Sequence, residues 1–389
     1  MPNKILKKLL FDFSLISFYL SLFLANLGLV SRVVLNNSIR FTIFEFVLYC
    51  FVLLIFLSLR QNVIKNLLKF KFLLLFLLYL WFNFIFQTVK YDTSSVIIAF
   101  LYLIRITVFF LLFPLLLIFF QQKYLVKQQV YSAIKLAFYL QIIFAAVQLI
   151  WYPNLRNLQH QGWDPHFYRL FSVYLDTYLA NNIFVLFAFF SLYLNWRLLF
   201  LIFSISSVAT FARAGIVFYS ASLLFNKIIS AKLKVLLVIA VAATALIFFS
   251  LNKQIAGQLL RSDTITSRLT DSYQAFSLFK NNPIFGVGFN FIGNYKSESY
   301  YPEVADLKPV YNAKSYFHNV YLTVAAASGI IGLILFLLML VELFRFYNKP
   351  DILTYLYLYS FVDNVMFNVF VLFYLAVFLN LLKLKTNLI

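Results

Sequence analysis

Charged residues are scarce in this sequence. They make up 12% of its 389 residues, and only 13 of them are acidic against 32 lysines and arginines. Hydrophobic residues make up 63%, which is more apolar surface than a soluble domain of this length buries. The scarcity of charge therefore excludes a soluble globular protein and predicts one whose helices are solvated by the lipid bilayer.

Cysteine and glycine are also rare. The single cysteine, Cys50, lies inside an apolar run, which excludes an internal disulfide and disfavours a thiol nucleophile. The glycines form no P-loop, and the pattern GVGFNFIG has the wrong spacing for a dinucleotide-binding fingerprint. The sequence also lacks the paired aspartates of metal-dependent enzymes that use nucleotide sugars. We therefore expect no cofactor.

Histidine occurs only three times. His160 and His166 flank Asp164 in the stretch QHQGWDPH, an arrangement that suggests a metal site. A structural zinc ion needs about four ligands, and no cysteine lies nearby to complete the set. The sequence therefore predicts no metal, and it leaves the role of the loop 152–166 open.

Long apolar runs dominate what is present. At roughly 20 apolar residues per span, they predict an all-α polytopic membrane protein with about 12 transmembrane helices and one long external loop. The first run is too long for a cleaved signal peptide, so we expect it to stay as a span. The predicted spans are 9–30, 41–59, 72–88, 96–120, 130–151, 174–194, 197–211, 213–229, 233–250, 318–344, 351–362 and 365–382.

The lysines and arginines are distributed as topology signals. In one set of short loops they outnumber those in the opposite set by 17 to 6, which by the positive-inside rule places both termini in the cytoplasm. The loops 152–173 and 251–317 then face outside. Because the cations are spread over many loops rather than gathered on one face, nucleic acid is not an expected partner, whereas membrane lipids are.

The external loop 251–317 contains one predicted helix. Residues Thr264 to Lys280 carry apolar side chains at helical spacing, and Asn281-Asn282-Pro283 ends the pattern. We expect this helix to lie along the outer membrane surface, with Arg268 and Asp271 on its wetter side.

Several polar side chains stand at or inside predicted spans. Arg213 lies at an external hinge between two spans and Arg169 precedes the sixth, where a guanidinium can bind a phosphate group bidentately. His318 opens the tenth span, and an imidazole can accept a proton from a sugar hydroxyl near neutral pH. The alternatives are arginines that snorkel at span ends and an interfacial histidine. Arg105 lies inside the fourth span, where charge is costly, and is a second candidate for a donor site.

Three segments in this order resemble the bacterial O-antigen ligase and O-antigen polymerase superfamily. They are ATFARAGIVFYSASLLF (209–225), SRLTDSYQAFSLFKNNPIFGVGFNFIGNY (267–295) and FHNVYLTVAAASGIIGLILFL (317–337). YRLFSVYLDTYLA (168–180) matches an earlier arginine motif of the family more loosely. The resemblance divides the chain into N-terminal transmembrane helices, 1–160, and a ligase/polymerase-like region, 161–389, that includes the external loop.

The resemblance implies a metal-independent glycosyltransferase of surface polysaccharide synthesis, in the bacterial cytoplasmic (inner) membrane. Such enzymes take a glycan from an undecaprenyl diphosphate carrier and pass it to a hydroxyl of a glycan or lipid acceptor on the outer face. Carried over by motif, Arg169 and Arg213 would hold the diphosphate with help from Arg268, and His318 would orient or deprotonate the acceptor. We favour a polymerase, with a ligase onto a lipid core, protein or cell-wall sugar as the alternative.

A transporter or flippase of lipid-linked glycans is the main alternative from another class. Such a protein should show broken helices near the middle of the membrane in two related halves. This sequence has one intramembrane cation, Arg105, and no second half that resembles the first. The gathering of polar residues in one external loop favours the enzyme.

Overall fold

The structure is a computed structural model. It describes residues 2–34, 40–122, 124–157, 166, 168–226, 230–232, 234, 235, 239, 243, 263–295 and 316–386. His160 and Asp164, nearly all of the predicted span 233–250, and parts of the external loop lie outside the described residues.

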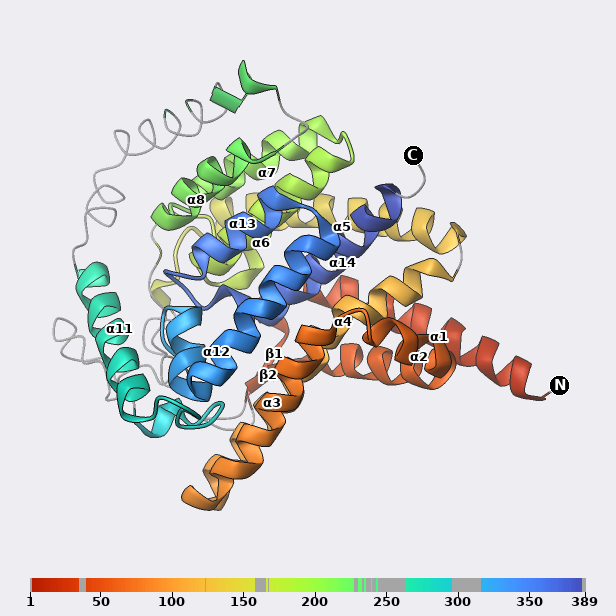
Figure 1. The fold of residues 1–389 in the computed structure, drawn as a ribbon. Helices are drawn as coiled ribbons and strands as arrows, with labels where there is room; N and C mark the ends of the chain where they lie inside the picture. The colour runs from red at the N-terminus through yellow and green to blue at the C-terminus, as the bar shows by residue number, and fades with distance from the viewer. Residues whose placement is uncertain are drawn as a thin grey trace. The chain divides into compact units, whose positions relative to one another are not determined.

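The described chain is almost entirely helical (Figure 1). Its α-helices are α1 Pro2–Ala25, α2 Ile43–Leu67, α3 Lys71–Gln87, α4 Thr93–Gln121, α5 Tyr124–Trp151, α6 Thr177–Tyr193, α7 Arg197–Ala209, α8 Arg213–Leu224, α11 Asp263–Asn281, α12 Val320–Tyr347, α13 Pro350–Tyr359 and α14 Val369–Thr386. Each predicted span that lies within the described residues overlaps one of these helices, and α11 is the helix predicted within the loop 251–317.

Five of the described helices are long and apolar enough to cross a membrane: Ile5–Ala25, Lys71–Lys90, Thr93–Gln121, Gln128–Trp151 and Val320–Tyr347. Four shorter helices are also apolar, namely Ile43–Leu59, Thr177–Tyr193, Arg197–Ala209 and Arg213–Leu224. These helices confirm an all-α type of membrane protein. The count of twelve spans stays a prediction.

The connection between α1 and α2 departs from the purely helical prediction. Two short strands, β1 Arg32–Val34 and β2 Arg40–Thr42, pair antiparallel with Arg32 opposite Thr42. The β-branched and aromatic residues of these strands favour extended backbone. A 3-10 turn, Gly28–Ser31, leads into the hairpin, so the helix of the first predicted span ends at Ala25 rather than near residue 30.

The elements group into two compact units, and neither is continuous in sequence. Unit 1 comprises Met1–Gln141, Ile334–Asn348 and Val369–Ile389, and unit 2 comprises Ile142–Leu333 and Lys349–Asn368. Helices α5 and α12 each contribute to both units. The division at residue 160, which followed the family resemblance, stays a prediction.

Unit 1 is packed around phenylalanine side chains. The buried ring of Phe18 lies with its centroid 5.6 Å from that of Phe51, 5.4 Å from that of Phe119 and 6.4 Å from that of Phe373. Between helices in lipid there is little hydrophobic driving force, so such van der Waals packing and buried polar contacts hold the helices together. These four rings come from α1, α2, α4 and α14, and their packing joins the four helices.

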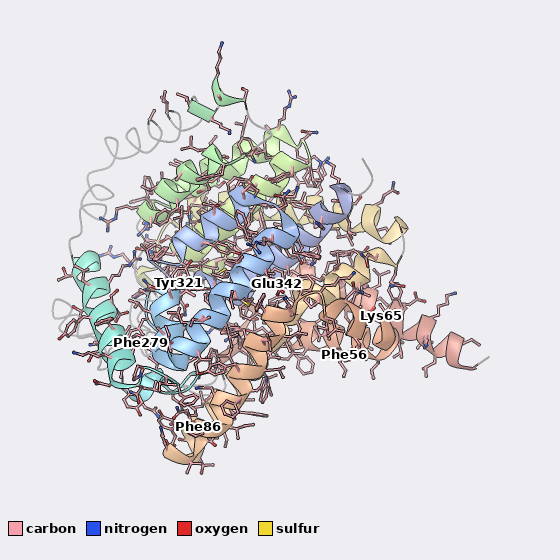
Figure 2. The ribbon with its side chains drawn as sticks, in the orientation of Figure 1. Phe56, Lys65, Phe86, Phe279, Tyr321 and Glu342 are labelled. Atoms are coloured by element: carbon pink, nitrogen blue, oxygen red, sulfur yellow. The ribbon has the colours of Figure 1, made fainter. Side chains whose placement is uncertain are left out.

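Unit 1 also contains a helix cap supplied by a distant residue. Glu342 of α12, labelled in Figure 2, accepts hydrogen bonds from the backbone N–H groups of Phe72 (3.2 Å) and Leu73 (3.0 Å) in the first turn of α3. The first N–H groups of a helix have no partner within it, and a carboxylate there also interacts favourably with the helix dipole. Glu342 therefore has a structural role as the cap of α3.

Unit 2 packs α6 against α7 and α8 against α13 (Figure 1). The buried amide of Asn181 in α6 accepts a hydrogen bond from Ser207 Oγ (2.7 Å) and donates one to the Tyr355 hydroxyl (2.9 Å). A Cβ atom at Gly215 of α8 would lie 2.0 Å from the Nδ2 atom of this amide. Glycine after Ala-Arg-Ala is therefore what allows α8 to approach the amide of α6.

Candidate functional site

The glycine-rich segment after α11 fits against a break in α12. At Gly329 the helix is interrupted, with φ 66° and ψ −167°. The segment 282–288 supplies backbone partners to the interrupted helix. Three hydrogen bonds join the two: Val287 N to Ala326 O (2.9 Å), Gly288 N to Ala327 O (2.8 Å) and Ile330 N to Pro283 O (2.8 Å).

Both sides of this junction require glycine. Gly286 has φ 66°, and a Cβ atom there would lie 2.4 Å from the backbone carbon of Ala327. A Cβ atom at Gly329 would lie 2.0 Å from the carbonyl oxygen of Ile284. Glycine alone adopts such backbone without steric cost. Gly286 of the NPxxGxG pattern and Gly329 of the following span therefore belong to the same contact. This contact holds the segment after α11 against the first part of α12.

His318 lies just before α12 and faces two carboxylates of unit 2. Its Nε2 atom is 3.8 Å from Asp271 Oδ2 on α11, and its Nδ1 atom is 3.8 Å from Asp363 Oδ1 after α13. Its Nδ1 atom is buried without a hydrogen-bond partner, while 39% of the side chain is exposed. The accessible edge of the ring is therefore the one that carries Nε2. Neighbouring backbone is held by hydrogen bonds from Val320 N to Ser360 O (2.9 Å) and from Asn319 Nδ2 to Phe361 O (3.1 Å).

Asp176 brings a third carboxylate to the same end of unit 2. It caps α6 by accepting hydrogen bonds from the N–H groups of Tyr178 (2.7 Å) and Leu179 (3.2 Å). Its carboxylate also lies within electrostatic reach of Asp363 and of the Arg169 guanidinium.

Arg169 supports the turn between α7 and α8. Its buried guanidinium donates hydrogen bonds from Nε to Thr210 O (3.0 Å) and from Nη2 to Phe211 O (3.3 Å). Phe211 has φ 53°, a left-handed conformation that costs energy for an aromatic residue and persists where surrounding contacts fix it. Gln148 of α5 fixes the same region, because its Oε1 atom accepts from the N–H groups of Phe171 and Ser172 (3.0 and 3.1 Å).

Arg213 and Arg268 are the more accessible arginines of unit 2. Arg213 is the first residue of α8, two residues after the left-handed turn, and its side chain is exposed. Its guanidinium adds to the positive end of the helix dipole. Arg268 of α11 is half-buried and lies 5.1 Å from the ring centroid of Tyr178, at the start of α6.

Arg105 lies in unit 1 and has a different environment. Its Nε atom is 2.6 Å from Glu45 Oε2, and its Nη2 atom donates a 2.8 Å hydrogen bond to Glu45 Oε1. Glu45 also accepts hydrogen bonds from the N–H and hydroxyl of Thr42 at the start of α2 (both 3.0 Å). The guanidinium therefore has a buried carboxylate partner, and its predicted contact with a donor phosphate stays a prediction.

Helix α11 presents its sides differently from the prediction. Asp271, expected on the wetter side, is only 5% exposed and faces the protein. Leu269, Tyr273 and Phe276 are instead 65%, 75% and 55% exposed. The reason is tertiary: Ala275, one turn after Asp271, packs in a buried cluster with Phe317, the residue before His318. The apolar stripe consequently points outward and the acidic residue inward.

Four of the five predicted residues, Arg169, Arg213, Arg268 and His318, thus belong to unit 2, and Arg105 belongs to unit 1. The carboxylates around His318 did not emerge from the sequence. Three signals in the sequence could have pointed to acidic residues. Asp176 precedes a helix, which is typical of an N-cap, and Asp271 lies three residues after Arg268, one helical turn away. With only 13 acidic residues in the chain, each is also informative.

Comparison with known proteins gives one family. Residues 178–337 match the family model described as O-antigen ligase. The matched segment begins in α6 and ends in α12, and it includes Arg213, Arg268, Asp271 and His318. A comparison with curated proteins finds no match.

Proposed function

We propose a specific reaction for this protein, and the match of residues 178–337 to the O-antigen ligase family model supports it. The protein moves a glycan from an undecaprenyl diphosphate carrier to an acceptor hydroxyl on the outer face of the bacterial cytoplasmic membrane. The reaction needs no metal and polymerises the repeats of a surface polysaccharide.

The observation that carries this proposal is the cluster at one end of unit 2. An imidazole with one buried and one accessible nitrogen lies between Asp271 and Asp363. Arg169 acts electrostatically on Asp176, which is also influenced by Asp363. A base, its orienting carboxylate and cationic side chains are the parts that transfer from a phosphate leaving group requires.

On the donor side, the arginines bind the diphosphate. When the bond between the anomeric carbon and the phosphate oxygen breaks, its electron pair leaves with the diphosphate, whose negative charge grows. Preplaced guanidinium groups stabilise that charge, and the loss of one such contact costs on the order of a hundred- to a thousandfold in rate. Arg213 and Arg268 make the contacts, while Arg169 holds the turn that presents Arg213.

On the acceptor side, His318 takes the proton. Its Nε2 atom accepts the hydrogen of the acceptor hydroxyl, whose oxygen forms the new bond to the anomeric carbon. Asp363 faces Nδ1 at 3.8 Å, beyond hydrogen-bond distance, so its carboxylate acts through its charge: it favours the ring orientation with Nδ1 towards it and stabilises the imidazolium that forms.

Deletion of the gene in its host, followed by gel analysis of surface and lipid-linked glycans, tests the proposal. Single repeats on the surface acceptor are expected, because a polymerase joins repeats before their attachment. Long chains stranded on the polyprenyl carrier with a bare acceptor would identify a ligase instead. Repeats trapped on the cytoplasmic face would identify a transporter and refute the glycosyltransferase.

Variants of His318 test the base within the same strain. His318→Ala should lower turnover far more than donor affinity, with His318→Gln equally impaired because an amide cannot take up the proton. Initial rates against donor concentration in membranes separate the two effects. A collapse of donor affinity with turnover unchanged would move His318 to the donor side.

A further inference from the structure

Asp271 is the carboxylate beside Nε2, the accessible nitrogen of His318, and only 7% of its own side chain is exposed. Its Oδ2 atom lies 3.8 Å from Nε2, whereas Asp363 lies by the buried Nδ1. The separation exceeds a hydrogen bond, so Asp271 is near the imidazole without binding it. The proposed mechanism uses Asp363 to orient the ring and gives Asp271 no task.

The fold places Asp271 at this position firmly. Ala275, one turn later on α11, is fully buried in a cluster that contains Phe317 and Ala326. Phe317 directly precedes His318, so the packing of α11 against the start of α12 carries Asp271 to the imidazole.

We propose that Asp271 is an acceptor-binding residue, which selects an acceptor sugar with a second hydrogen-bond donor beside the attacking hydroxyl. The inference rests on the proposed function. A hydroxyl hydrogen-bonded to Nε2 lies about 3 Å from that nitrogen, and therefore beside the carboxylate. Neighbouring substituents of a sugar ring are separated by about one hydrogen-bond length, which matches the placement of Nε2 and Oδ2 side by side.

The chemistry of a carboxylate defines the class of acceptor. An ionised carboxylate only accepts hydrogen bonds and offers about four positions for them, so it can bind a substrate group in addition to protein groups. It binds a neighbouring hydroxyl, amide N–H or ammonium group and repels a phosphate or carboxylate. The acceptor is therefore a neutral or amino sugar at the site of attachment, rather than one with an acidic group beside the attacking hydroxyl.

The test combines enzyme variants with matched acceptors. The probe is the methyl glycoside of the acceptor's terminal sugar, as identified by glycan analysis of the deletion strain. It is used intact and with the substituent beside the linkage position removed. Transfer to each is measured with the full-length wild type, Asp271→Ala, Asp271→Asn and, as a charge-matched control in α1, Asp12→Asn, which is exposed.

With the wild type, removal of the neighbouring group should lower kcat/KM for the acceptor roughly ten- to a hundredfold, as expected for a lost hydrogen bond to a charged group. Asp271→Ala should impose a similar loss on the intact acceptor, mainly in its KM, and little further loss on the truncated one. Asp271→Asn should fall between, and Asp12→Asn should match the wild type.

Equal losses on both acceptors, or an effect on kcat or on donor KM alone, would overturn the assignment while leaving the glycosyltransferase intact. Absence of transfer by the wild type would refute the proposed function instead. Binding of the intact and truncated glycosides to His318→Ala protein, measured by saturation-transfer NMR, tests Asp271 in that case as well. If His318→Ala protein binds the intact glycoside better than the truncated one, and the double variant His318→Ala/Asp271→Ala does not, the inference is supported. If the double variant still prefers the intact glycoside to the same degree, the inference is refuted.

Discussion

Arg105 of unit 1 and His318 of unit 2 have opposite surroundings. In unit 1, Arg105 contacts Glu45 at 2.6 Å and Glu342 caps the first turn of α3, so that each charge has a close partner. In unit 2, His318 lies 3.8 Å from each of two carboxylates, and its Nδ1 atom has no hydrogen bond. Close partners mark Arg105 and Glu342 as structural, whereas the looser arrangement around His318 is the one suited to a substrate.

This difference also separates residues that look alike in the sequence. Arg105 and Arg213 are both isolated arginines in apolar surroundings, and both were predicted to bind the donor. Arg105 is bound by a carboxylate from another helix, whereas Arg213 begins α8 with an exposed side chain. Burial and the identity of the partner, rather than depth in a predicted span, distinguish the two.

The largest expected effect concerns the junction that builds the site of unit 2. Gly329→Ala should prevent correct folding of this unit, because the added Cβ atom would lie 2.0 Å from the carbonyl oxygen of Ile284. The yield of monodisperse protein in detergent measures this. Ser328→Ala, which adds no atoms at the neighbouring position, is the control and should leave the yield close to that of the wild type. A normal yield of Gly329→Ala would show that the junction is not required.

The next effect concerns Arg213, the exposed arginine at the start of α8 in unit 2. Arg213→Ala should lower transfer on the order of a hundred- to a thousandfold while the protein still inserts and folds, since the side chain is exposed. Arg197→Ala is the matched control, because Arg197 is also exposed and begins the adjacent helix α7. Initial rates in membranes with equal protein levels decide. Transfer near the wild-type rate would remove Arg213 from the donor site.

Arg105→Ala tests the ion pair between Arg105 and Glu45 in unit 1. Loss of the guanidinium leaves the buried carboxylate of Glu45 without its partner, which should cost about 3–5 kcal/mol of stability. Thermal unfolding in detergent measures the loss, and the double variant Arg105→Gln/Glu45→Gln should recover part of it. Unchanged stability together with lost transfer would support the sequence-based prediction that Arg105 binds the donor.

The sequence predicted most helices because apolar runs and their punctuation are local signals. Asn281-Asn282-Pro283 ends α11 where expected, and His318 lies two residues before α12. The paired strands before α2 were missed because each is only three residues long, too short for an alternating pattern to show in the sequence. The orientation of α11 was not predictable, since it depends on the packing of Ala275 against residues distant in sequence.

The residues of the candidate site were predicted in part. Arg213 and His318 stood out because their motifs resemble a family, but their partners depend on tertiary contacts. Asp363 approaches His318 only because α13 returns to the start of α12, where Val320 N donates to Ser360 O. The sequence also did not show that Arg169 supports the turn between α7 and α8. That role is visible only in its two hydrogen bonds to backbone carbonyl groups, and it is separate from the predicted contact with a phosphate.

The junction between the segment 282–288 and α12 has a consequence for biogenesis. The segment is synthesised before α12, yet two of its N–H groups find their partners only at Ala326 and Ala327, on the next span. We expect translocation of the segment and insertion of α12 to be completed as one event. Unit 2 is then completed late in synthesis, when the span that follows His318 has left the translocon.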